Sequence, residues 1–207
     1  MKTQPPMNER VKANMGAMAA TLDFDAELML RVKDGDGASF SILLEKHRSP
    51  VIHFLYRMVQ NQAVAEELAQ EVFLRVYRSR GSYEPTAKFT TWLFRIATHL
   101  ALNALRDGRN QRLEDRLDDD SSDTPVRQVS DKQPTVEQKM VYQVRLDEVR
   151  RAVAMLPEKQ RAAVLMHKYE EMEYSQIAKA LDCSESAIKS LLFRAYESLR
   201  ARLAHMA

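Results

Sequence analysis

Apolar residues recur every three or four positions along most of this 207-residue chain, and that spacing limits its possible folds more than any other feature. Such a period gathers apolar side chains on one face of an α-helix, whereas a half-buried strand needs strict alternation. Glycine and proline, which interrupt helices, number only 5 and 7. The sequence therefore predicts an all-α protein.

A tract rich in aspartate, serine and proline divides this helical pattern in two. Residues 113–136 offer too little apolar surface to offset the chain entropy lost on ordering. We therefore predict two small helical domains, 22–112 and 137–207, joined by a flexible acidic linker, which suits a chain of this length. Residues 1–21 carry no apolar stripe long enough to bury, and they are predicted to form a mobile N-terminal tail.

The helical segments are separated by polar, glycine-containing or proline-containing breaks. The stretch from Ser79 to Phe89 contains Gly81 and Pro85, so it is predicted as a loop. In the first domain we predict helices from residue 24 to the turn at 34–37, then over 38–60, 63–78 and 90–109. In the second domain, helices over 136–156 and 157–169 precede the C-terminal motif.

The C-terminal stretch Tyr174 to Arg200 predicts a helix-turn-helix. Ser175 and Ser184 stand where hydroxyls would satisfy the unpaired first-turn amides of helices over 176–181 and 185–203. A turn of about three residues between them would cross the two helices around a small shared core. Cys183 in this turn is expected to be a small buried hydrophobe rather than a reactive thiol.

Small and cationic side chains remain on the outer face of the second of these helices. Small residues permit close approach to the major groove of DNA, and long cations reach phosphates or guanine edges. The same pattern also fits an ordinary helical hairpin with a solvated face, and periodicity alone leaves both interpretations open. The candidate DNA-contacting residues are Ser184, Ser186, Ala187, Lys189, Ser190, Phe193 and Arg194.

Composition excludes several other classes of function. The single cysteine allows no intramolecular disulfide. The five histidines have no metal-ligand spacing, and no glycine-rich phosphate loop is present, so we expect no catalytic residues, metal, cofactor or small-molecule substrate. No stretch reaches the roughly 20 apolar residues that cross a bilayer, and the start lacks an export signal, so we expect a cytoplasmic protein without membrane insertion. The net charge of +2 decides little.

Three segments resemble, in order, parts of one known family. LPEKQRAAVLMHKYEEMEYSQIAKALDCSESAIKSLLFRAYESLR is similar to region four of the extracytoplasmic-function group of bacterial RNA polymerase sigma factors. AVAEELAQEVFLRVYR resembles the polymerase-binding segment of region two, and KFTTWLFRIATHLALNALR resembles its promoter-opening segment. The resemblance covers residues 24–112 and 137–203. Both regions in order are far more specific than a helix-turn-helix alone.

The resemblance implies a sigma factor rather than an enzyme. Such a protein binds core RNA polymerase, recognises minus-thirty-five and minus-ten promoter DNA, stabilises the melted strand, and is usually controlled by an anti-sigma factor. Residues 22–112 would then be the region 2 domain and 137–207 the region 4 domain. The outer face of helix 63–78 resembles the surface that docks on the largest core subunit. Its residues are Glu66, Glu67, Gln70, Glu71 and Phe73.

The segment implied to meet the minus-ten element begins in the loop before helix 90–109. Aromatic and cationic side chains there could cover unstacked bases and follow the backbone. Trp92 favours core packing by its spacing, and base stacking is the alternative. His99 stands where the family commonly has asparagine, and Leu191 where it commonly has arginine, so base preferences should be shifted. The implied minus-ten residues are Ser82, Tyr83, Lys88, Phe89, Thr90, Trp92 and His99.

Two other functions are compatible with parts of the sequence. In a stand-alone regulator, only the C-terminal helix pair would bind duplex DNA, tightly and without polymerase, while residues 24–112 would sense a signal or dimerise. A helical enzyme finds little support. If the chain is a sigma factor, a flexible linker of about 24 residues leaves the second DNA contact at a modest effective concentration, so the free chain should bind promoters poorly.

Overall fold

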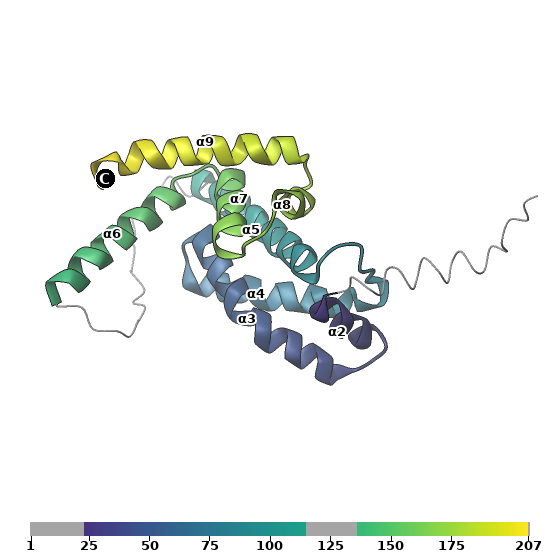
Figure 1. The fold of residues 1–207 in the computed structure, drawn as a ribbon. Helices are drawn as coiled ribbons and strands as arrows, with labels where there is room; N and C mark the ends of the chain where they lie inside the picture. The colour runs from purple at the N-terminus through teal and green to yellow at the C-terminus, as the bar shows by residue number, and fades with distance from the viewer. Residues whose placement is uncertain (1–22, 115–135, 207) are drawn as a thin grey trace, which may run out of the picture.

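The computed structural model describes residues 23–114 and 136–206, and it places the side chains of 23–108 and 143–206. Every regular element in this part of the chain is helical, which confirms the all-α prediction (Figure 1). The first domain comprises α2 (Phe24–Lys33), α3 (Gly37–Val59), α4 (Gln62–Arg78), the short turn η1 (Arg80–Ser82) and α5 (Phe89–Glu114). The second comprises α6 (Val136–Ala154), α7 (Glu158–Tyr169), α8 (Tyr174–Leu181), α9 (Glu185–Leu203) and η2 (Ala204–Met206).

Most predicted segments agree with these helices to within a residue or two. Helix α5 is the main exception, because it continues to Glu114 and takes up the first residues of the predicted linker. The rest of that linker, and the predicted N-terminal tail, lie outside the described residues.

Polar caps set where the helices of the first domain begin. Asp23, Asp36 and Asn61 cap α2, α3 and α4, and each accepts a first-turn amide hydrogen that has no partner within its helix. Gly35 has φ +99° and makes the turn between α2 and α3, a conformation that favours glycine.

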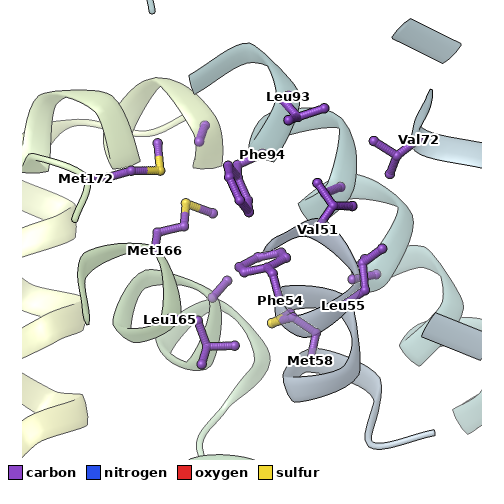
Figure 2. Packing of buried hydrophobic residues seen from close by; sticks show 14 of the residues in the cluster. Val51, Phe54, Leu55, Met58, Val72, Leu93, Phe94, Leu165, Met166 and Met172 are labelled. Carbon is purple, nitrogen blue, oxygen red and sulfur yellow. The ribbon is translucent and has the colours of Figure 1, made fainter. Parts of the chain in front are cut away.

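The core of the first domain forms where α3, α4 and α5 meet. Figure 2 shows Val51, Leu55, Val72 and Leu93 from these helices on one side of α5, and each is less than 1% exposed. Leu74 of α4 lies outside this core and is 42% exposed. It follows Val72 by about 200° around the helix, which turns it toward solvent.

The helix-turn-helix forms as predicted, with one corrected cap. Ser184 caps α9, and its hydroxyl accepts a first-turn amide at 3.2 Å. Ser175 is not a cap, because α8 begins earlier, at Tyr174, and Glu173 precedes it. The backbone amide of Glu173 donates to Gln176 Oε1 at 2.8 Å, which is half of a capping box.

The two helices of this motif pack around the expected small core. Asp182 ends α8 in the left-handed region with φ 52°, a conformation that aspartate tolerates better than most residues. Cys183 is half-buried, and burial raises the pKa of its thiol, which disfavours the reactive thiolate. The buried members of the core are Ile177, Ala178, Ala180 and Leu181 from α8 and Ile188, Leu192 and Ala195 from α9.

The two domains pack directly against each other. Helix α8 lies along α5, and α7 lies against α3, so the two domain cores join into one apolar cluster. Figure 2 shows Phe94 of α5 and Phe54 of α3 pointing toward Leu165, Met166 and Met172 of the second domain. The two phenyl rings meet edge-on with centroids 5.2 Å apart. The sequence did not predict this contact between the domains.

Polar and cationic groups reinforce the contact at its edge. Arg161 of α7 donates to the carbonyl of Met58 at the end of α3, and also to Leu156 O in its own domain at 3.2 Å. The guanidinium of Arg57 lies 3.9 Å from the centre of the Tyr169 ring, which allows a cation–π attraction between the domains. Burial raises the pKa of the neighbouring Glu170 to about 7, although the charge of Arg57 opposes this shift.

Candidate polymerase and promoter interfaces

The outer face of α4 carries the polar residues that the sequence singled out. Glu66, Glu67 and Gln70 are exposed, and Glu71 is half-buried beside Arg75, whose Nε lies 2.7 Å from it. Phe73 differs from the other four, because it is only 6% exposed and belongs to the core. The face is therefore acidic and polar, without an outward phenyl ring.

An apolar groove of about 440 Å³ runs beside this polar face, between α3 and α4. Leu74 and Tyr77 line it and are 42% and 41% exposed, an unusual exposure for side chains of this size. Phe40 of α3 packs against Tyr77 with ring centroids 5.0 Å apart. Sequence reasoning missed both α4 residues, although their spacing of four and seven from Gln70 places them on its side of the helix.

The loop between α4 and α5 turns its aromatic residues inward. Tyr83 is 4% exposed and Phe89 is 0% exposed, and both pack against Trp92, which is partly buried. Burial also raises the pKa of the Tyr83 hydroxyl to about 12. Core packing is therefore the role of Trp92 seen here, and in this conformation Tyr83 and Phe89 offer no free ring face to a base.

The other minus-ten candidates lie at the surface of this domain. Ser82, Lys88 and His99 are exposed, and Thr90 is half-buried at the start of α5. The Ser82 hydroxyl donates to the carbonyl of Ser79 at 3.0 Å, which tightens the turn η1. Polar side chains thus surround a loop whose shape is set by buried rings.

The outer face of α9 is open to solvent, as its helical period predicted. Phe193 is 68% exposed, the largest exposed fraction among the described large apolar side chains. Arg194 Nε donates to the carbonyl of Ser190 at 3.3 Å, one turn earlier. A shallow hollow beside this face is lined by Ser186, Ser190 and Arg194 of α9. Lys159 of α7, which the sequence did not single out, lines the same hollow. The exposed members of the predicted set are Ser184, Ser186, Lys189, Ser190, Phe193 and Arg194, and Ala187 is half-buried.

Two tests for other kinds of site are negative within residues 23–108 and 143–206. No group of histidine, cysteine, aspartate or glutamate side chains there is placed to hold a metal ion. None of the described helices combines the length and the apolar character that a bilayer span requires.

A helix-turn-helix with an open face of small and cationic side chains places the protein among the helix-turn-helix DNA-binding proteins. Residues 43–111 match the family described as Sigma-70 region 2, and residues 146–199 match the family described as Sigma-70, region 4. The chain belongs to the sigma-70 family of RNA polymerase sigma factors, in the group named ECF. The predicted resemblance is confirmed.

Curated relatives and a solved structure agree with this assignment. The chain is 35% identical over 179 residues to RNA polymerase sigma factor CarQ of Myxococcus xanthus, a match that covers 86% of this chain and 97% of CarQ. It is 31% identical over 180 residues to the ECF RNA polymerase sigma-E factor of Haemophilus influenzae, covering 86% and 95%. The fold resembles the sigma factor RpoE of Bartonella quintana, solved with the anti-sigma factor NepR, with TM-score 0.64 and 19% identity over 80% of this chain and 96% of that one.

Membership of this family settles the function in outline. The protein is an alternative sigma factor, which binds core RNA polymerase and promoter DNA, and members of its family are transcription initiation factors. The match of residues 43–111 to sigma region 2 also removes the main support for a stand-alone regulator with a sensory first domain.

Proposed function

We propose that three separate surfaces of this chain divide the work of promoter recognition. Helix α4 and its groove dock on core polymerase, the loop 79–89 with the start of α5 captures the minus-ten element, and α9 reads the minus-thirty-five element. The observation that carries the proposal is the solvent exposure of three chemically distinct surfaces on two domains whose other faces are buried in one core.

The α4 surface combines the features of a docking site. Leu74 and Tyr77 supply apolar anchors beside a groove, and aromatic anchors in pockets contribute much of the energy of protein interfaces. Glu66 and Glu67 lie exposed on the same helix. Acidic residues at a rim steer a basic partner and set its orientation more than they add affinity.

The minus-ten surface fits single-stranded DNA better than duplex. Lys88 and His99 are exposed, so they can follow a strand that has separated from its complement. A base that leaves the stack loses a few kcal/mol, which pocket contacts must return. Tyr83 and Phe89 contribute in this proposal by shaping the loop rather than by stacking on a base.

The minus-thirty-five surface fits the major groove. Ser186 and Ser190 leave room for close approach at the start of α9, while Lys189 and Arg194 reach outward. Lys159 adds a cation from α7 beside them. Leu191, where the family commonly has arginine, supports a base preference that differs from the common one.

The packed arrangement of the domains must open during promoter binding. The two promoter elements lie about 25 base pairs apart, which is roughly 85 Å of duplex at about 3.4 Å per base pair. Helix α8 lies against α5, and we infer that this packing holds the two DNA-reading surfaces closer together than the two elements lie on duplex DNA. The packing of the two domains is therefore a second cause, beside the flexible linker, of the weak promoter binding expected for the free chain. Docking on core polymerase provides the energy that separates the domains.

We also propose that the protein acts in the cytoplasm, catalyses no reaction itself, and is controlled by an anti-sigma factor. The family supports the first two statements, because its members are initiation factors. The presence of the anti-sigma factor NepR in the Bartonella quintana RpoE structure supports the third.

Reconstituted transcription tests the proposed function. Purified protein mixed with bacterial core polymerase and a promoter library should yield transcripts that depend on its addition, whereas free protein should bind the same promoters weakly. Failure to bind core under mild conditions would refute the proposal, and tight duplex binding without polymerase would support a stand-alone regulator instead.

A further inference from the structure

One carboxylate caps two helices of the first domain. Asp23 Oδ1 accepts from the amide of Ala26 at 2.7 Å and so closes the first turn of α2. Asp23 Oδ2 accepts from the amide of Phe89, the first residue of α5 and 66 positions further along the chain, at 3.3 Å. Both helices begin with unpaired amides and the positive end of their dipoles, so a single negative side chain stabilises both starts. Asp23 thereby ties the start of α5 to the start of α2.

The other end of α2 holds the loop that precedes α5. Lys33, the last residue of α2, donates from Nζ to the carbonyl of Tyr83 at 3.0 Å. Helix α2 has 10 residues and is therefore about 15 Å long. The C-terminal end of α2 binds Tyr83 and its N-terminal cap binds Phe89. Helix α2 therefore fixes both ends of the segment between these two residues.

Helix α2 is in turn bound to α3. The carboxylate of Asp25 on α2 is buried, and it accepts from Lys46 Nζ at 2.6 and 2.8 Å. His47 Nε2 lies 2.9 Å from the same carboxylate, and the His47 ring packs 5.4 Å from the ring of Phe89. A buried charge with several partners is costly to displace, so α2 has little freedom to slide along α3.

We propose that Asp23 and Lys33 are positioning residues for promoter opening. They hold the segment between Tyr83 and Phe89 in the conformation that receives an unstacked base of the minus-ten strand. They act through the carbonyl of Tyr83 and the amide of Phe89, without touching DNA. This inference rests on the proposed function of the loop 79–89. A preformed loop spends less conformational entropy when it captures a base, which raises affinity for the open strand.

The decisive experiment compares substitutions that separate the two roles of Asp23. Serine is a good helix cap, so Asp23→Ser keeps the cap of α2 while removing the second oxygen that serves Phe89. Lys33→Met removes the ammonium group and keeps the length of the side chain, and Lys33→Arg restores a donor. Arg31→Met is a matched control, because it removes a cation from the same turn of α2 and leaves the bond from Lys33 to Tyr83 in place.

Each full-length variant is assembled with core polymerase and measured in two assays. One is binding of a fluorescent single-stranded oligonucleotide carrying the non-template minus-ten strand, and the other is permanganate reactivity of thymines in a duplex promoter. We expect Asp23→Ser and Lys33→Met each to weaken strand binding about fivefold, the ratio expected for loss of one helix cap at α5 in the first variant and of one hydrogen bond in the second. Lys33→Arg and Arg31→Met should stay near wild type, and affinity for core should be unchanged in all four.

The outcomes distinguish this inference from the function on which it rests. If the wild-type holoenzyme binds the strand and both Asp23→Ser and Lys33→Met bind it equally well, α2 does not position the loop and the inference is wrong. A parallel loss of affinity for core would show a general structural role and would overturn it as well. If the wild-type holoenzyme itself fails to bind the strand, the proposed minus-ten role of the loop is refuted, and the inference that depends on it is refuted as well.

Discussion

Replacing Phe94 with alanine should separate the two domains of the free protein. The Phe94 side chain is 2% exposed and points between the domains, toward Met166 and Met172 (Figure 2). Truncation of a buried phenylalanine costs about 3–5 kcal/mol. Part of this contact is with Phe54 of the same domain. We therefore assign about 2 kcal/mol to the packed arrangement, which shifts the ratio of open to packed protein roughly 30-fold.

The chain carries a natural pair of probes for this opening. Its single tryptophan, Trp92, lies on α5, and its single cysteine, Cys183, follows α8 on the other domain. A small acceptor dye attached to Cys183 should quench tryptophan emission by energy transfer while the domains are packed, and Phe94→Ala should lower that transfer. Because burial raises the pKa of the thiol, labelling needs mildly alkaline buffer.

Leu93→Ala is the matched control for this experiment. Leu93 is adjacent in sequence and fully buried, but it faces the core of its own domain (Figure 2). Its truncation should lower the free energy of unfolding and leave the energy transfer of the folded protein intact. Equal transfer in wild type and Phe94→Ala, or an equal loss in both variants, would refute our reasoning about the interface.

Three further predictions address the proposed surfaces and the domain contact. Lys189→Ala combined with Arg194→Ala should abolish transcription from the promoter while leaving affinity for core unchanged, and an equal loss of core binding would mean that α9 is structural. Leu74→Ser combined with Tyr77→Ala should weaken core binding tenfold or more, as measured by fluorescence anisotropy, with little loss of thermal stability because both side chains are over 40% exposed. Burial raises the pKa of Glu170 to about 7 from its ordinary 4.5, so the folded protein binds more protons than the unfolded chain between these values. Stability should therefore fall as pH rises from about 4.5 to 7, by about 2 kcal/mol in denaturant titrations after allowance for screening, and Glu170→Gln should remove this component. A pH dependence that is identical in Glu170→Gln would contradict the assignment.

Local signals were enough to predict most helices and the recognition motif. The spacing of apolar residues and the hydroxyl of Ser184 predicted α9 with the bounds that the structure shows. Ser175 failed as a cap because Glu173, two residues earlier, occupies that position, and a single sequence does not rank two such close candidates. The exposed set on α9 follows from the same helical period.

Contacts between distant parts of the chain were beyond the reach of that reasoning. Tyr83 and Phe89 were predicted to cover bases because they flank the cation Lys88 in a loop, where no period indicates burial. In the structure both are buried in the aromatic cluster with Trp92. The hydrogen bond from the Phe89 amide to Asp23 joins residues 66 positions apart, so the local sequence around neither residue predicts it.

The sequence by itself determined that this chain is helical, that it ends in a helix-turn-helix, and that it belongs with the sigma factors. The helical class and the helix-turn-helix depend on spacing and caps within a few turns of helix, where neighbours in sequence are also neighbours in space. The sigma-factor assignment came from the resemblance of three segments to that family. Only the tertiary structure decided that Phe94 and Arg161 join the two domains. The physical reason is that burial and long-range hydrogen bonding depend on which surfaces meet, and an apolar face on a helix does not specify its partner.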